Sequence, residues 1–152
     1  MKVFIHKLDF ENIPSKIIES IPNKINTIIK QCVKFTLQQE KFKNKTELSI
    51  ILCSDKEIKK LNKQYLNKNR TTDVLCFSYS IKPVLNADIF ISLESAFYQS
   101  NIYAWDFINE IIFLVIHGIL HSLGWNDNTE KKRKKMLQKQ YQIMKSIKIL
   151  WY

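Results

Sequence analysis

Hydrophobic side chains recur along this chain at two different spacings, which predict both strands and helices. Residues 3–9 alternate between apolar and polar side chains, as a half-buried strand does. From residue 15 to 38 the apolar positions fall at helical spacing, and Pro22 is expected to break or kink that segment. Residues 47–53 are the next strand candidate.

A capped helix is expected after this second strand, because Ser54-Asp55 can begin a helix that runs to Leu66. The later elements are expected as strands at 73–79 and 88–93, joined by a loop with Lys82-Pro83, and as helices at 106–123 and 128–149. No repeat or linker interrupts the chain, so residues 1–152 are expected to form a single domain. The order of elements predicts an α+β fold, a mixed four-stranded sheet covered by helices.

The predicted helix at 106–123 is apolar on nearly every face, so we expect it at the centre of the core. Near its carboxyl end it carries His117 and His121, which are four residues apart and therefore share one face. Two imidazoles held side by side on a packed helix can bind a transition-metal ion. The pair predicts a zincin-like metal site on a buried helix.

Both glycines of the chain and two of its three histidines fall within residues 117–124. Gly124 can adopt the left-handed conformation that ends a helix, and the resulting turn would bring Asp127 toward the histidines. Catalytic zinc sites are built from three protein ligands that leave one position open. His117, His121 and Asp127 are therefore the candidate ligands of one zinc-like divalent ion.

Other interpretations fit the same residues. The segment Asp127-Asn128-Thr129-Glu130 also matches a capping box, in which Asp127 would only begin the next helix. The two histidines could also be a hydrogen-bonded core pair, although facing imidazoles without a metal are costly to bury. Gly118 stands where zinc peptidases of the His-Glu-x-x-His type have their general-base glutamate, which argues against peptide hydrolysis.

The composition limits the partners and the compartment. A net charge of +10 favours a polyanionic partner, but a general bias toward lysine, isoleucine and asparagine explains the charge equally well. Three widely spaced cysteines in apolar segments indicate buried, reduced thiols of a cytosolic protein. No stretch is long enough to span a bilayer. We expect a cytoplasmic protein that uses neither a membrane nor a dinucleotide cofactor.

Residues 117–127 resemble the signature of the bacterial YbeY family of metal-dependent endoribonucleases, which reads His-Gly-x-Leu-His-Leu-x-Gly-Tyr-Asp-His. Further resemblances to the family are Leu61-Asn62 with Tyr65, residues 72–77 (its Thr-Asp-Val-Leu-Ser-Phe), residues 87–89 (its Gly-Asp-Ile) and Met136. The likeness covers about residues 46–140. It implies a zinc-dependent hydrolase of ribosomal RNA that acts at the small ribosomal subunit.

The chain departs from the family pattern at two positions. Asp127 replaces a third histidine, and this carboxylate should make a bound water less acidic than three neutral imidazoles would. Leu66 replaces an arginine implicated in catalysis and cannot pair with phosphate. Arg70 is the nearest candidate substitute, with Lys68 a weaker one for binding nucleic acid, although a solvated loop arginine is an equally good interpretation.

The resulting hypothesis is a single-strand endoribonuclease of ribosomal RNA maturation and ribosome quality control, in which a zinc-like ion acts as Lewis acid. The alternative is a ribosome-associated RNA-binding protein of the same fold whose hydrolytic activity is weakened by Leu66 and Asp127. Residues 131–135 (Lys-Lys-Arg-Lys-Lys) are the densest run of positive charge, and on a helix they are most simply a solvated face.

Overall fold

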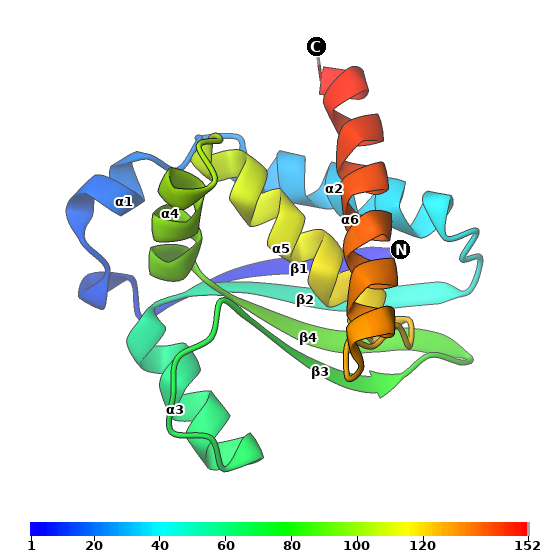
Figure 1. The fold of residues 1–152 in the computed structure, drawn as a ribbon, viewed down its shortest axis with the longest axis horizontal. Coiled ribbons are helices and arrows are strands. Elements are labelled where there is room, and N and C mark those ends of the chain that lie inside the picture. Colours follow the sequence, from blue (N-terminus) through cyan, green and yellow to red (C-terminus); the bar gives the residue numbers. More distant parts are fainter. Residues whose placement is uncertain (152) are drawn as a thin grey trace.

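A four-stranded mixed sheet forms the base of the fold (Figure 1). The computed structural model describes residues 1–151, with side chains through Ile147. The strands are β1 (Lys2–Leu8), β2 (Lys45–Cys53), β3 (Val74–Ser80) and β4 (Val84–Ser92), in the order β1-β2-β4-β3. β1 and β4 both run parallel to β2, whereas β3 pairs with β4 as an antiparallel hairpin. β3 is therefore an edge strand.

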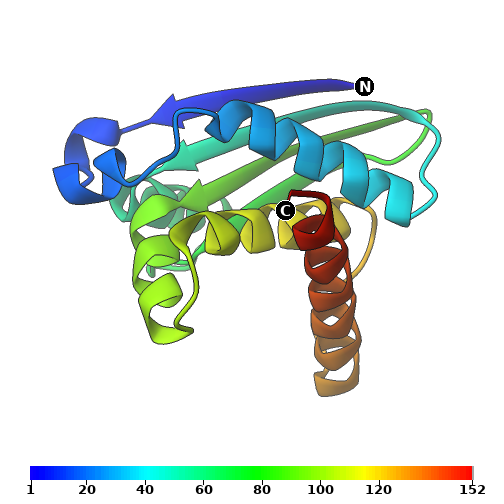
Figure 2. The ribbon, with the colours of Figure 1, turned by 90° about the horizontal axis from the view of Figure 1, so that it is seen from above.

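The helices are arranged around α5 (Phe107–Ser122), which lies with α2 (Ile25–Gln39) along one face of the sheet. Helices α4 (Leu93–Ile102) and α6 (Glu130–Trp151) stand at the two ends of α5 and project away from the sheet (Figure 2). The short η1 (Phe10–Asn12) and α1 (Ser15–Glu19) connect β1 to α2. Ten residues of α5 are buried, so the sheet, α2, α4 and α6 all pack against a fixed central helix.

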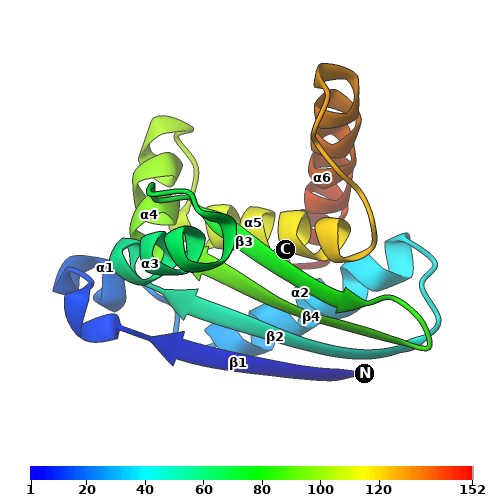
Figure 3. The same cartoon turned by 90° about the horizontal axis from the view of Figure 1, so that it is seen from below.

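The opposite face of the sheet is covered only in part, by α3 (Asp55–Leu66), and Figure 3 shows this face from below. Because side chains alternate along a strand, one set faces α5 and the other faces α3. The α3 side holds a separate small cluster of Ile51, Cys53, Ile58 and Leu75. From α3 the chain returns through residues 67–73 to β3, and this loop forms one side of the cleft described below.

The α+β class and the four-stranded mixed sheet are confirmed. Pro22 separates α1 from α2 as expected, and α3 has the predicted bounds, with the Ser54 hydroxyl accepting a hydrogen bond from the Glu57 amide at 3.0 Å. The prediction of a strand at 88–93 is wrong at both ends, because β4 begins at Val84 and Leu93 already belongs to α4. Helix α4 itself was not predicted.

No single helix in residues 1–151 is both long and apolar enough to cross a membrane. Helices α4 and α5 satisfy the length and composition test only when taken together, and they are bent by 116° relative to each other.

Candidate metal centre

His117 and His121 lie one turn apart on α5, on a side of the helix that borders a cleft shared with β3. Their Nε2 atoms are 2.9 Å apart, and the ring planes meet at 71°. Gly118, between them, faces the sheet, where a Cβ would lie only 2.4 Å from Cγ2 of Ile89 on β4. The absence of a side chain at Gly118 thus lets α5 lie close to the sheet, and that contact fixes the direction of the two imidazoles.

The turn after α5 brings the third candidate ligand back to the histidines. Gly124 has a φ of 100°, and its amide donates to the His121 carbonyl at 3.0 Å while the Trp125 amide donates to the Leu120 carbonyl at 3.0 Å. This pair of bonds is a Schellman motif, which ends the helix and reverses the chain. Oδ2 of Asp127 consequently lies 3.6 Å from Nε2 of His121 and 4.0 Å from Nε2 of His117.

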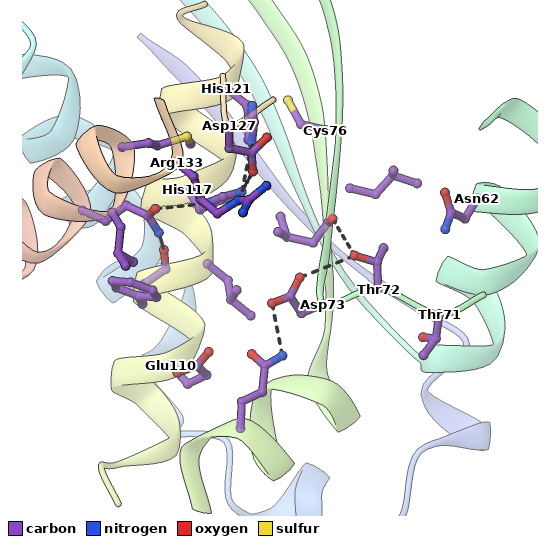
Figure 4. Close-up of a pocket in the computed structure, with 18 of the residues that line it drawn as sticks. Asn62, Thr71, Thr72, Asp73, Cys76, Glu110, His117, His121, Asp127 and Arg133 are labelled. Carbon is purple, nitrogen blue, oxygen red and sulfur yellow. Dashed lines mark hydrogen bonds and ion pairs between the residues drawn. The ribbon is translucent and has the colours of Figure 1, made fainter. Parts of the chain in front are cut away.

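The structure does not use Asp127 to cap the next helix. α6 begins at Glu130, and the amide of Lys132 donates to Oγ1 of Thr129 at 3.2 Å. Thr129 is therefore the side chain that satisfies the first turn of α6. The Asp127 carboxylate is directed at the histidines instead (Figure 4).

A contact from α6 sets the tautomer of His117. Oε1 of Gln140 lies 3.0 Å from Nδ1 of His117, and Nε2 of Gln140 donates to the Phe113 carbonyl at 3.5 Å. Because the amide oxygen can only accept, Nδ1 of His117 carries the proton and Nε2 presents its lone pair to the site. Burial lowers the pKa of His121, and the neighbouring His117 lowers it further, so this imidazole also favours the neutral form that binds metals.

The three side chains fit a divalent ion. Their ligand atoms all lie within 4.8 Å of one another. Ligands about 2.0–2.1 Å from a tetrahedral zinc ion lie about 3.3 Å apart, and the three measured separations fall on both sides of that value. Two imidazoles and one carboxylate are a donor set that zinc accepts. The group could therefore hold a metal ion.

The candidate ligands lie at one end of a cleft of about 840 Å³. In Figure 4, the α5 side chains and Arg133 form one side, and Asn62 and Thr71 lie across from them. The edge strand β3 and the loop 67–73 complete the second side, and both Lys68 and Arg70 line it. Leu66, which is 46% exposed, also lines the cleft. The structure thus brings all five predicted site residues to one cleft.

Among the cleft residues that were not predicted as part of the site, three are considered for their contacts or charge: Gln140, Arg133 and Glu110. Gln140 and Arg133 belong to α6, and their role depends on how that helix packs against α5, which local sequence does not reveal. Glu110 is 1% exposed on α5, and burial raises its pKa to about 7. A helical-face count back from His117 could have found it, because residues 110, 114, 117 and 121 fall on one stripe.

Two of the three cysteines are buried, as expected. Cys32 and Cys53 are buried, and burial raises the pKa of each to about 12. Cys76 is only half-buried, since it lies on β3 at the cleft, and burial raises its pKa to about 11.

Comparison with known proteins identifies the family of this chain. Residues 10–148 match the protein family described as Endoribonuclease YbeY. A relative of that name from Acetivibrio thermocellus is 35% identical, over 98% of each chain, and one from Malacoplasma penetrans is 38% identical over 78% of this chain and 82% of the relative. A solution structure of a Thermotoga maritima protein superposes with a TM-score of 0.58 at 26% identity, covering 97% of this chain and 91% of that one. The chain therefore belongs to the YbeY endoribonuclease family.

Proposed function

We propose that this protein is a zinc-dependent endoribonuclease that cleaves single-stranded RNA in ribosomal RNA maturation and ribosome quality control. The observation that carries the proposal is the meeting of His117, His121 and Asp127 at one end of a cleft whose other residues include Lys68 and Arg70. Membership of an endoribonuclease family supports the same substrate class.

Each residue at the metal centre has a separate task in this proposal. The two imidazoles and the carboxylate would hold the ion, and Gln140 would keep His117 in the tautomer that can bind it. When bound, the ion would supply Lewis acidity toward a phosphate oxygen and would make a water molecule more acidic. Arg70 and Lys68 would attract the RNA backbone to the open side of the cleft.

The lining of the cleft favours a single strand over a duplex. Apolar side chains are accessible beside the polar ones, among them Leu66, Tyr103 and Leu137, which are 46%, 63% and 42% exposed. Unpaired bases can leave the stack and rest on such surfaces, whereas bases in a duplex cannot. In the cell, the substrate would be RNA of the small ribosomal subunit in the cytoplasm.

A second candidate function has its own observation in favour. Leu66 lines the cleft where the family pattern has an arginine, and Asp127 adds a negative charge among the ligands. Both features would weaken hydrolysis but not the attraction of RNA to a basic protein. The alternative is therefore a ribosome-associated RNA-binding protein with little catalytic activity.

Cleavage of a labelled single-stranded ribosomal RNA fragment separates the two candidates. We expect zinc-loaded wild type to cleave it, and chelator-treated protein and the His121→Ala variant to lose cleavage while still binding the RNA. Asp127→His and Leu66→Arg, separately and together, should raise the rate. If wild type and all of these variants cleave no faster than the metal-stripped control while RNA binding persists, the nuclease proposal fails and the RNA-binding alternative is favoured.

A further inference from the structure

The chain uses arginine at only two positions. Of its 24 basic side chains, only Arg70 and Arg133 are arginine, and the other basic residues are all lysine. Both arginines line the same cleft as the candidate metal ligands. A compositional bias toward lysine explains the bulk of the positive charge, but it does not explain why both exceptions occur there. We call Arg70 and Arg133 the arginine pair.

Arg133 differs from its basic neighbours in where it points. Residues 133, 137 and 140 lie on one stripe of α6, and all three line the cleft. Gln140, on that stripe, contacts Nδ1 of His117 at 3.0 Å, which places the stripe toward the metal centre. Lys131, Lys132, Lys134 and Lys135 do not line the cleft, so the basic run contributes one cation to it.

Arg70 is carried by a loop that a buried side chain holds in place. The Nδ2 atom of Asn62 donates to the Arg70 carbonyl at 3.0 Å, and the Lys68 amide donates to the Asn62 carbonyl at 3.2 Å. Asn62 is 3% exposed, so this anchor belongs to the packed part of α3. The backbone of Arg70 is therefore held beside Asn62, and Figure 4 shows Asn62 and Thr71 across the cleft from α5 and Arg133.

Both guanidinium groups are available to a ligand. Among the described residues, neither arginine side chain makes a hydrogen bond or an ion pair. Guanidinium is planar and offers paired N–H donors that match two oxygens of a phosphate, whereas the ammonium of lysine acts as a point charge. Arginine on two sides of one cleft, with lysine elsewhere, is thus an arrangement suited to holding phosphate groups.

We infer that the arginine pair binds phosphate groups of the RNA strand from the two sides of the cleft and so positions the strand over the metal centre. The inference rests on the proposed function for the identity of the ligand. It assigns to Arg133 a role distinct from that of the neighbouring lysines. It also makes Arg70 one of two partners and not a lone substitute for the residue that Leu66 replaces.

The test compares charge loss inside the cleft with the same loss outside it. Variants are Arg70→Gln, Arg133→Gln and both together, with Lys132→Gln and Lys135→Gln as matched controls on exposed positions of α6. Binding of a fluorescent single-stranded RNA is measured by anisotropy, on metal-free and zinc-loaded protein, at several salt concentrations. Each arginine variant should weaken binding about 10-fold or more, and each should reduce the slope of log affinity against log salt by about 0.7.

Arg70→Lys and Arg133→Lys separate geometry from charge. These variants should retain the salt slope of wild type but lose about 10-fold in cleavage rate, because lysine keeps the charge without the paired donors. Lys132→Gln and Lys135→Gln should change affinity by less than about threefold. Equal effects of Arg133→Gln and Lys132→Gln, or lysine variants that match wild type in every measurement, would overturn the inference.

The outcomes also separate this inference from the proposed function. Wild type that binds RNA with the expected arginine dependence but never cleaves it would refute the nuclease proposal and leave the arginine pair intact. Cleavage that requires His121 but is unchanged in Arg70→Gln and Arg133→Gln would refute the arginine pair alone.

Discussion

Asp127 is the residue on which the chemistry of the site most depends. Its Oδ2 atom lies 3.6 Å from Nε2 of His121. The family pattern has a third histidine at this position, which would complete a set of three neutral imidazoles. We expect Asp127→Ala to lose most of the bound zinc, because two ligands hold the ion far less tightly than three, and Asp127→His to retain it. The measurement is zinc content after dialysis.

Thr129→Ala is the control for that experiment, since Thr129 caps α6. Loss of the cap should cost about 1 kcal/mol of stability and leave the zinc content at one ion per chain. Full zinc occupancy in Asp127→Ala would show that the carboxylate is not a ligand.

Glu110 gives the stability of the protein a specific pH dependence. Burial raises its pKa to about 7, the hydrogen bond from Trp105 opposes the shift and the charge of Asp73 adds to it. Between the ordinary value of 4.5 and about 7, the folded protein retains a proton that the unfolded chain releases. The contribution of Glu110 is therefore complete below pH 4.5 and is lost as the pH rises through about 7.

Glu110→Gln should remove this dependence, because glutamine is neutral at every pH. We expect the free energy of unfolding of the variant, relative to wild type, to rise by about 1–3 kcal/mol between pH 4.5 and pH 8. Urea denaturation at both values measures it, with Glu130→Gln on the surface as control. A difference that does not vary with pH would contradict the assignment.

The meeting of the candidate ligands was predictable because their geometry is local. His117, His121 and Gly124 lie within eight residues, so helical spacing and one turn define their arrangement. Gln140 and Arg133 reach the site only through the packing of α6 against α5, whereas Glu110 lies on α5 itself. No local pattern distinguishes Gln140 and Arg133 from ordinary polar positions on a helix, but Glu110 falls on the same helical stripe as His117 and His121.

At the scale of elements, the contact between α5 and the sheet can be tested at Gly118, with Gly124 as the comparison. Gly118→Ala would place a Cβ 2.4 Å from Ile89 and should destabilise the protein by about 1–3 kcal/mol. The double variant with Ile89→Ala removes the opposing side chain and should lose less than the sum of the two single variants. Urea denaturation of the four proteins gives the coupling.

Gly124→Ala has a different physical cause and serves as the comparison. Its Cβ would meet nothing closer than 4.0 Å, but its φ of 100° is unfavourable for alanine. We expect a loss of about 1 kcal/mol, which a smaller residue at Ile81 should not relieve. Relief by that second change would mean that crowding and not backbone conformation is responsible.

The elements that the sequence predicted well have strong local signals. Pro22 and the Ser54 cap define helix ends by backbone chemistry alone. α4 was missed because Leu93 continues the alternating apolar pattern of Ile89 and Ile91 in β4. Ser92 is the signal that was available, since its hydroxyl accepts from the Ser95 amide at 3.1 Å as an N-cap.

At the scale of the whole molecule, the main hydrophobic core contains none of the candidate metal ligands. The main cluster joins the sheet to α2, α5 and α6 without using the candidate ligands. We therefore expect chelator-treated protein to keep its far-ultraviolet circular dichroism and a cooperative melting transition. Zinc at about 100 times its Kd should stabilise the folded state by about 2.7 kcal/mol, a rise in Tm of about 5–10 °C.

Differential scanning calorimetry with and without zinc measures this change in Tm. His121→Ala is the control, and its Tm should not rise when zinc is added. Loss of the melting transition on chelation would mean that the ion is structural. The net charge of +10 could not be assigned to a binding surface from composition alone. The positions of the two arginines at the cleft become visible only in the folded structure.

The contact between Gln140 and His117 joins two parts of the molecule that differ in exposure. α5 is enclosed by the sheet and its neighbouring helices, whereas α6 projects outward and carries mainly solvated side chains along its first turns. Any partner that docked on α6 and shifted it would move the amide away from the imidazole. The affinity of the candidate site for a metal ion would then respond to an event on an outer helix.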